Sequence, residues 1–218
     1  MMASKLSWAT DAFPSSLDHI LLGCNDLQRG IDFVEQQTGV RAVFGGVHPG
    51  RGTQNALLSL GKLHYLEIIA PDPKQSEVRQ FAQIKDFTTP RLVTWAAHPG
   101  NLDDVAKKLS AAGIRFDGPR AGSRARPDGR MLSWKSLAMD DRHGLVPFFI
   151  EWGADSPHPA VDAPGGCRIE RFFATDPNPD DLKKVYRSIG IDMTVERGAQ
   201  PQLHATIVGP EGKMEVSS

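Results

Sequence analysis

The chain has 218 residues, and 40% of them are apolar, which is enough for one substantial hydrophobic core or two small ones. Its formal net charge is -1 and its pI is about 6.7, so neither a nucleic-acid partner nor an anionic membrane is expected. The expected partner is a small or medium-sized molecule.

Two cysteines, Cys24 and Cys167, lie far apart and form no CxxC pattern, so reduced thiols are expected. Residues 1–16 contain one lysine and no apolar centre, which argues against a secretory signal. No apolar run approaches the roughly 20 residues that span a bilayer. These features predict a cytoplasmic protein without a membrane segment.

Residues 17–71 form the first structural unit. A short apolar run is followed by a helical pattern that Gly39 ends, then by a glycine-rich turn and two further apolar runs. This order predicts a strand, a helix and three strands. His19 lies near the start of the first strand and Glu67 in the middle of the last. If these strands are neighbours, the two side chains converge, and both types are suitable ligands for zinc, iron, manganese or nickel.

Residues 91–153 repeat this order after a polar connection with one predicted helical turn. The second helix ends at Gly113, as the first ends at Gly39, and a final apolar strand holds Glu151. Setting this strand, FIEWG, over the earlier YLEII places Glu151 at the position of Glu67. This shared position supports the interpretation of residues 91–153 as a second copy of the first unit.

A third, shortened copy is predicted over residues 168–216, where the helix ends at Gly190. One such βαβββ unit leaves a sheet face exposed, so two units are expected to pair. The predicted fold class is α+β, with tandem βαβββ modules pairing into a curved, barrel-like sheet and helices outside. A homodimer is one expected way to cover the sheet edges, and the third unit is the other.

The glycine-rich turn of the first unit contains candidate substrate-binding residues. Glycines in GGVHPGRGTQN let backbone amides turn toward a ligand, and alternate residues of the following strand face one side. The predicted substrate-binding residues are His48, Arg51, Thr53 and Asn55. The alternative interpretation is a polar hairpin turn with no ligand.

Residues 115–130 are rich in arginine and are interpreted as a loop. It is either a solvated surface loop or a mobile lid whose guanidinium groups clamp a carboxylate or phosphate. The arginines are Arg115, Arg120, Arg124, Arg126 and Arg130.

Taken together, the unit order, the DH pair at residues 18–19, the segment GGVHPGRGTQN and the closing strands YLEII and PFFIEWG resemble a known family. The chain is similar, over roughly residues 17–153, to the glyoxalase-like domain of the vicinal oxygen chelate superfamily, alongside glyoxalase I, bleomycin-resistance proteins and extradiol dioxygenases. The resemblance implies paired modules that form a cup. Such cups often hold a divalent metal on the first and last strands of two modules, where a substrate with adjacent oxygens chelates.

Carried over by position, the resemblance implies His19, Glu67 and Glu151 as metal ligands. The fourth ligand position falls on Val93 or Thr94, neither of which is a histidine or a carboxylate. The two glutamates are also the predicted catalytic residues, because a weakly coordinated carboxylate can move a proton.

The resemblance thus implies a divalent-metal-dependent enzyme with isomerase or lyase chemistry on a small oxygen-rich substrate. The alternative is a metal-free protein of the bleomycin-resistance type that binds and sequesters a small molecule. In that case the polar turn supplies contacts, and one or two aromatic residues of the second unit supply a wall, while most of them belong to the core. These aromatic residues are Trp95, Trp134, Phe148, Phe149 and Trp152.

Overall fold

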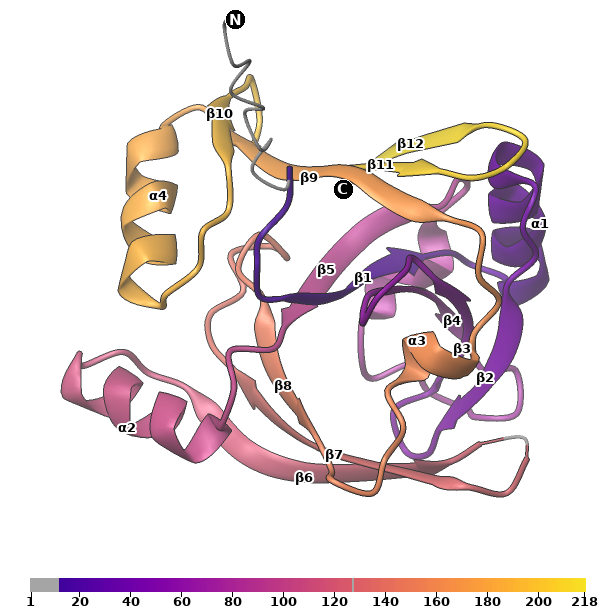
Figure 1. Cartoon of the computed structure of the whole chain (residues 1–218), viewed down its shortest axis with the longest axis horizontal. Coiled ribbons are helices and arrows are strands. Elements are labelled where there is room, and N and C mark those ends of the chain that lie inside the picture. Colours follow the sequence, from indigo (N-terminus) through magenta and orange to yellow (C-terminus); the bar gives the residue numbers. More distant parts are fainter. Residues whose placement is uncertain (1–11, 127) are drawn as a thin grey trace, which may run out of the picture.

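A computed structural model describes residues 12–126 and 128–218 of the protein (Figure 1). The expectation about a secretory signal falls mostly on residues 1–11, which lie outside the described residues. Among the described residues, no helix is both long enough and apolar enough to cross a membrane.

The first module has the predicted order of elements. Strand β1 (Leu17–Gly23) leads to helix α1 (Leu27–Thr38), and strands β2 (Val43–His48), β3 (Thr53–Ser59) and β4 (Tyr65–Pro71) follow. The Asp26 side chain accepts a hydrogen bond from the Arg29 backbone N–H and begins α1. Gly39 ends it with a φ of 76°, a conformation that favours glycine. A short 3₁₀ helix, η1 (Ala82–Asp86), lies in the connection where one helical turn is predicted.

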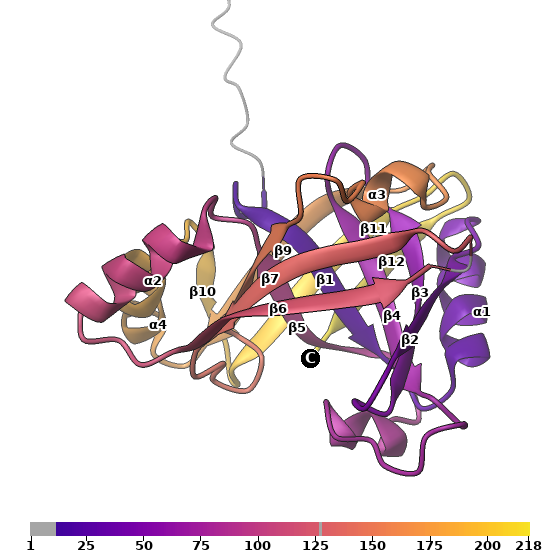
Figure 2. The same ribbon diagram turned by 90° about the horizontal axis from the view of Figure 1, so that it is seen from below.

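The second module contains β5 (Arg91–Ala97), α2 (Leu102–Ala111), β6 (Asp117–Ala125), β7 (Met131–Ala138) and β8 (Phe148–Trp152). The interpretation of residues 115–130 as a loop is wrong for most of that segment, because β6 pairs with β7 in an antiparallel hairpin (Figure 2). The sequence of β6, DGPRAGSRA, lacks the β-branched and aromatic residues that indicate a strand. Pairing with β7 supplies the backbone partners instead.

All eight strands of the two modules form one curved sheet in the order β2-β3-β4-β1-β5-β8-β7-β6. Within each module the last strand runs parallel to the first, and β1 and β5 join the modules in antiparallel pairing. Helices α1 and α2 lie outside the curve (Figure 1). This confirms the predicted α+β fold with a curved, barrel-like sheet.

The third unit follows a linker that holds the short helix α3 (Pro159–Asp162). It contains β9 (Arg168–Asp176), α4 (Pro179–Ser188), β10 (Val195–Arg197), β11 (Gln202–Val208) and β12 (Lys213–Ser217). The element order matches that of the modules, but the pairing differs. Its sheet has the order β10-β9-β11-β12, so the first strand runs parallel to β10 and not to the last strand.

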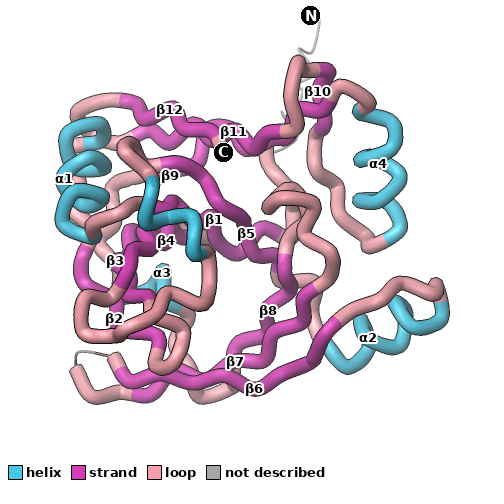
Figure 3. The backbone as a smooth tube through the Cα atoms, turned by 180° about the vertical axis from the view of Figure 1, so that it is seen from behind, coloured by secondary structure: helices cyan, strands magenta, loops and turns pink. Residues whose placement is uncertain are grey.

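This second sheet packs on the first, because β11 and β12 contact β5 (Figure 3). The two sheets share one hydrophobic core. Trp95 of β5 meets Phe172 of β9 edge-on, with ring centroids 5.5 Å apart, and both are fully buried. The Tyr186 hydroxyl of α4 donates to the Leu145 carbonyl at 2.8 Å. The third unit therefore covers the side of β5 that faces away from the cavity described next.

Candidate functional site

A cavity of about 570 Å³ lies within the curve of the eight-stranded sheet. Its size is in the range of small-molecule sites. The first module contributes mainly polar and ionisable side chains to the wall, including His19, His48, Asn55 and Glu67. The second module contributes many of the aromatic and apolar ones, including Trp134, Phe148, Ile150 and Trp152.

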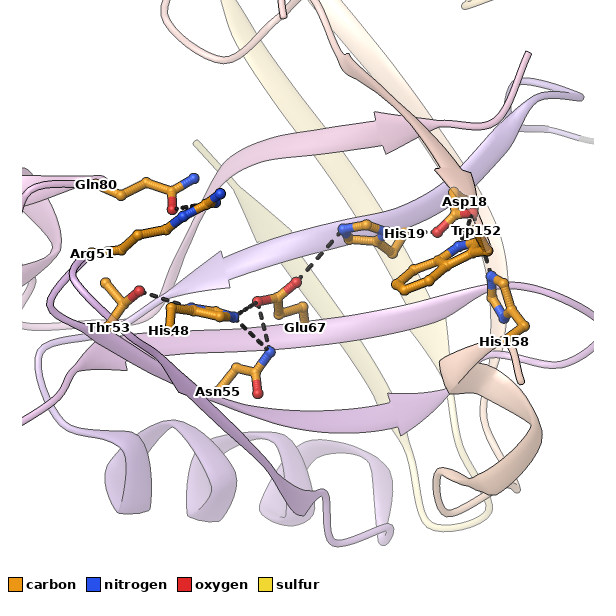
Figure 4. Close-up of polar contacts among 10 residues, drawn as sticks. All are labelled: Asp18, His19, His48, Arg51, Thr53, Asn55, Glu67, Gln80, Trp152 and His158. Atoms are coloured by element: carbon orange, nitrogen blue, oxygen red, sulfur yellow. Dashed lines mark hydrogen bonds and ion pairs between the residues drawn. The ribbon is translucent and has the colours of Figure 1, made fainter. Parts of the chain in front are cut away.

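Glu67 is the centre of the polar group (Figure 4). Parallel pairing of β1 with β4 sets His19 opposite Tyr65, so Glu67, two residues further along β4, faces the same side. The His19 Nε2 atom lies 3.6 Å from Glu67 Oε2, and His48 Nε2 lies 3.7 Å from Glu67 Oε1. The Asn55 side-chain amide donates to Oε1 at 2.8 Å. The predicted convergence of His19 and Glu67 is therefore present, with His48 on the other side.

Asp18 fixes the orientation of His19. Its Oδ1 atom accepts from His19 Nδ1 at 2.7 Å, while Oδ2 accepts from Trp152 Nε1 at 3.0 Å and from His158 Nε2 at 3.3 Å. Burial alone would raise the pKa of this carboxyl, but hydrogen bonds from His158 and His19 hold the pKa well below its usual value. Because Asp18 is ionised, His19 donates through Nδ1 and turns Nε2 toward Glu67. Tyr65 stacks on the ring with centroids 4.3 Å apart.

His48 is held by Thr53, whose Oγ1 atom lies 2.8 Å from His48 Nδ1. Burial lowers the pKa of His48; the Glu67 carboxylate opposes that shift, and the positive charge of Arg124 adds to it. His48 is therefore uncharged near neutral pH, and an uncharged imidazole can accept a proton.

The predicted substrate-binding residues fall into different places. His48 and Asn55 lie on the cavity wall beside Glu67, and Arg51 lies at the exposed rim, where it donates to Gln80 at 3.1 Å. Thr53 is fully buried behind His48. Three of the four thus line the cavity, and Thr53 supports one of them.

Glu151 does not join this group. The residues of β8 that line the cavity are Phe148, Ile150 and Trp152, so Glu151 points to the opposite face. There its Oε2 atom accepts from the Leu102 backbone N–H at 2.6 Å, at the start of α2. Aligning β8 with β4 on the shared glutamate shifts β8 by one residue, and a shift of one residue in a strand reverses the facing of every side chain.

The expected metal ligands are consequently not assembled. In the part of the chain that the structure describes, no three histidine, cysteine or carboxylate side chains form a group suited to one ion. The first and last strands of the second module, β5 and β8, present Thr94, Phe148, Ile150 and Trp152 to the cavity, and none of these is a histidine, cysteine or carboxylate. The residues present therefore do not fit the ligand set that the resemblance implies.

Sequence patterns missed several residues of the site. Asp18 precedes His19 in β1, where strict alternation places neighbours on opposite faces, but a bulge in the β1–β5 pairing lies between Leu17 and His19. His158 lies in the linker, so its position in the site depends on the path that the linker takes. Arg124 lies in the segment interpreted as a loop. Of these residues, only Asp18 had a signal in the sequence, because it belongs to the DH pair at residues 18–19.

The comparisons with known proteins place the chain in a family. The model of the glyoxalase-like domain matches residues 17–190. No curated protein matches the sequence significantly. Among solved structures, a hypothetical protein from Staphylococcus aureus has 18% sequence identity and a TM-score of 0.66, over 92% of this chain and 84% of its own. At that identity the likeness is one of fold.

Two methylmalonyl-CoA epimerase structures match with lower scores. The enzyme from Mycobacterium tuberculosis has 19% identity and a TM-score of 0.44, over 72% of this chain and 96% of its own. An epimerase in complex with methylmalonyl-CoA and NH4+ has 21% identity and a TM-score of 0.47, over 66% of this chain and 99% of its own. The family model covers most of the chain, and the fold agrees with it. The chain therefore belongs to the glyoxalase-like domain family.

Proposed function

We propose that this protein is an acid–base enzyme that moves a proton at a carbon next to a carbonyl group of a small oxygen-rich molecule, in an isomerase or lyase reaction. One observation carries the proposal. The Glu67 carboxylate is buried on the cavity wall, and an imidazole Nε2 atom faces each of its two oxygens. Proton transfer needs such groups within reach of one another.

In the proposed reaction Glu67 takes the proton from the substrate carbon. The electron pair of the broken C–H bond moves onto the carbonyl oxygen and gives an enolate. Return of the proton to another position completes an isomerisation, and departure of a neighbouring group completes an elimination. Asn55 holds one oxygen of Glu67 during these steps, and uncharged His48 can carry the proton onward.

The divalent ion that the resemblance implies would meet only His19 and Glu67 of its expected ligands, with His48 nearby. A bound divalent ion would polarise the carbonyl group. Because Glu151 lies on the other face of β8, the proposal assigns the proton steps to the side chains alone. Elemental mass spectrometry of untagged protein tests this point: near-stoichiometric metal that is lost in His19→Ala and Glu67→Ala would favour the metal-dependent enzyme instead.

The test of the proposed reaction is hydrogen–deuterium exchange followed by proton NMR. In D₂O, the signal of a C–H group next to a carbonyl is recorded for a panel of small ketones, 2-oxo acids and hydroxyketones. We expect the wild type to accelerate exchange for at least one class, and Glu67→Gln to slow it by about a hundredfold or more. The matched control is Glu151→Gln, which should stay within about twofold of the wild type because Glu151 faces away from the cavity.

A second candidate function follows from the aromatic side chains of the cavity wall. Trp134, Phe148 and Trp152 line it beside the polar group, and aromatic walls bind flat ligands well without reaction. The protein would then sequester a small molecule, as the bleomycin-resistance alternative suggests. Tight binding of a panel compound with no exchange above the uncatalysed rate, in wild type and Glu67→Gln alike, would favour this function over the enzyme.

A further inference from the structure

Arg124 is a buried cation whose charge is not neutralised by an ion pair. Arg124 is 7% exposed, and its side chain lines the cavity. Among the described residues no carboxylate oxygen lies within 4.0 Å of it, although Arg126 and Arg130 on the same hairpin both pair with Asp162. Burying an unpaired charge is costly, so an anion is expected opposite it.

The position of Arg124 results from the curvature of the sheet. The edge strands β2 and β6 contact one another (Figure 2). Arg124 reaches from β6 to donate through Nη1 to the Gly45 carbonyl of β2. A Cβ atom on Gly46 would lie 2.7 Å from that Nη1, so glycine leaves the space that the guanidinium occupies. Within the described residues, the Gly45 carbonyl is its hydrogen-bond acceptor. The other N–H groups of the guanidinium therefore remain for a ligand in the cavity.

The other two arginines of the cavity differ from Arg124. Arg51 is exposed and donates to Gln80, and Arg120 is exposed and pairs with Asp117. Both therefore have protein partners at the rim. Only Arg124, among the cavity arginines of the described residues, combines burial with a guanidinium that lacks an acidic partner.

The local charges limit which anion fits. Arg124 and Glu67 influence one another electrostatically, and His48 is uncharged near neutral pH. Glu67 already places one negative charge on the same cavity wall without pairing with Arg124, so one added negative charge is tolerated better than two. A planar carboxylate also matches the fork of a guanidinium, which can donate two parallel hydrogen bonds.

We infer that Arg124 binds the carboxylate of a monoanionic substrate, so the substrates are small carboxylic acids with a carbonyl-activated C–H group, such as 2-oxo acids. The inference rests on the proposed function in taking the Glu67 cavity as the substrate site. With the carboxylate at Arg124, the C–H group on the far side of the carbonyl carbon would be presented to Glu67. Arg124 thus selects the substrate, while Glu67 moves the proton.

Calorimetric titration tests the inference with pyruvate and phenylpyruvate, each compared with its neutral amide, and with inorganic phosphate. In the wild type we expect each acid to bind at least about tenfold more tightly than its amide and more tightly than phosphate. Equal binding of acid and amide would overturn the inference, and tighter binding of phosphate would overturn the monoanion assignment. This comparison requires no variant.

Variants then locate the carboxylate. Arg124→Met is expected to weaken acid binding by about tenfold or more, and Arg124→Lys to weaken it less, because a lysine keeps the charge but not the fork. Arg130→Met, on the same hairpin but outside the cavity lining, is the matched control and should stay within about twofold. Circular dichroism checks that each variant is folded. If Arg124→Met does not fold, Arg124→Lys and the acid–amide comparison decide, and unchanged acid binding in folded Arg124→Lys and Arg124→Met would overturn the assignment.

Glu67→Gln separates this inference from the proposed function. It removes a negative charge from the cavity, so acids should bind at least as tightly as in the wild type while exchange is lost. Selective acid binding through Arg124 with no exchange in the wild type would sink the proposed reaction and leave the carboxylate site. Exchange that depends on Glu67 but is equally fast for acids and amides would support the proposed reaction and overturn the carboxylate site at Arg124.

Discussion

Asp18 is the residue on which the orientation of the site depends most. It is buried, it is ionised, and three side-chain N–H groups from β1, β8 and the linker converge on it. Replacing it removes the negative charge and leaves at least one buried donor facing an amide N–H. Such a loss affects both stability and the direction in which His19 presents Nε2.

We expect Asp18→Asn to lower the free energy of unfolding at pH 7 by about 3 kcal/mol. The folded pKa of Asp18 lies below its ordinary value of 3.8, so its stabilising contribution is present above that pH and is lost as the pH falls toward the folded pKa. The variant should therefore lose less stability than the wild type on acidification below about pH 4. Urea unfolding at several pH values measures this.

The exposed Asp32→Asn serves as the control for this measurement, since Asp32 pairs with Arg41 at the surface of α1. It should leave the acid dependence close to that of the wild type. Identical acid dependence in Asp18→Asn and wild type would contradict the assignment of Asp18 as an ionised acceptor.

At the scale of elements, Glu151 links β8 to α2. Its carboxylate accepts the Leu102 N–H, and Asn101 accepts the Asp104 N–H, so two side chains satisfy the first turn of the helix. A negative charge there also interacts favourably with the helix dipole. These contacts are structural, in contrast to the metal-binding and catalytic role that the resemblance implies.

Glu151→Ala is accordingly expected to lower the free energy of unfolding by about 1 kcal/mol and to leave ligand binding in the cavity unchanged. Glu151→Gln keeps an acceptor for the Leu102 N–H and should lose less stability. Chemical denaturation and calorimetry measure the two effects. Loss of binding in a folded Glu151→Ala would mean that Glu151 acts in the cavity after all.

The same element shows what sequence patterns can and cannot predict here. The meeting of His19 and Glu67 follows from two local strand positions and one parallel pairing, which the repeated unit order already implies. The face of the sheet on which Glu151 lies depends on the register of β8 to within one residue. Because apolar residues stand on both sides of Glu151, the sequence pattern does not fix that register. Arg124 depends on the contact between β2 and β6, which are far apart in the sequence and meet only when the whole sheet curves.

At the scale of the whole molecule, the third unit and the two modules share a core, so they are expected to unfold together. Phe172→Ala leaves a cavity against Trp95 and should cost about 3–5 kcal/mol. We expect a single transition at a lower midpoint, seen alike by tryptophan fluorescence and far-ultraviolet circular dichroism. Two separated transitions would show that the third unit unfolds independently of the two modules.

The cavity wall divides unequally between the two modules. The acid and base groups Glu67, His19 and His48 come from the first, while Arg124 and the aromatic side chains Trp134 and Trp152 come from the second. In the proposed function, the first module thus supplies the reacting groups and the second supplies the groups that select the ligand. On that proposal, substitutions in the second module would change which ligands the cavity accepts without altering the proton-carrying group of the first.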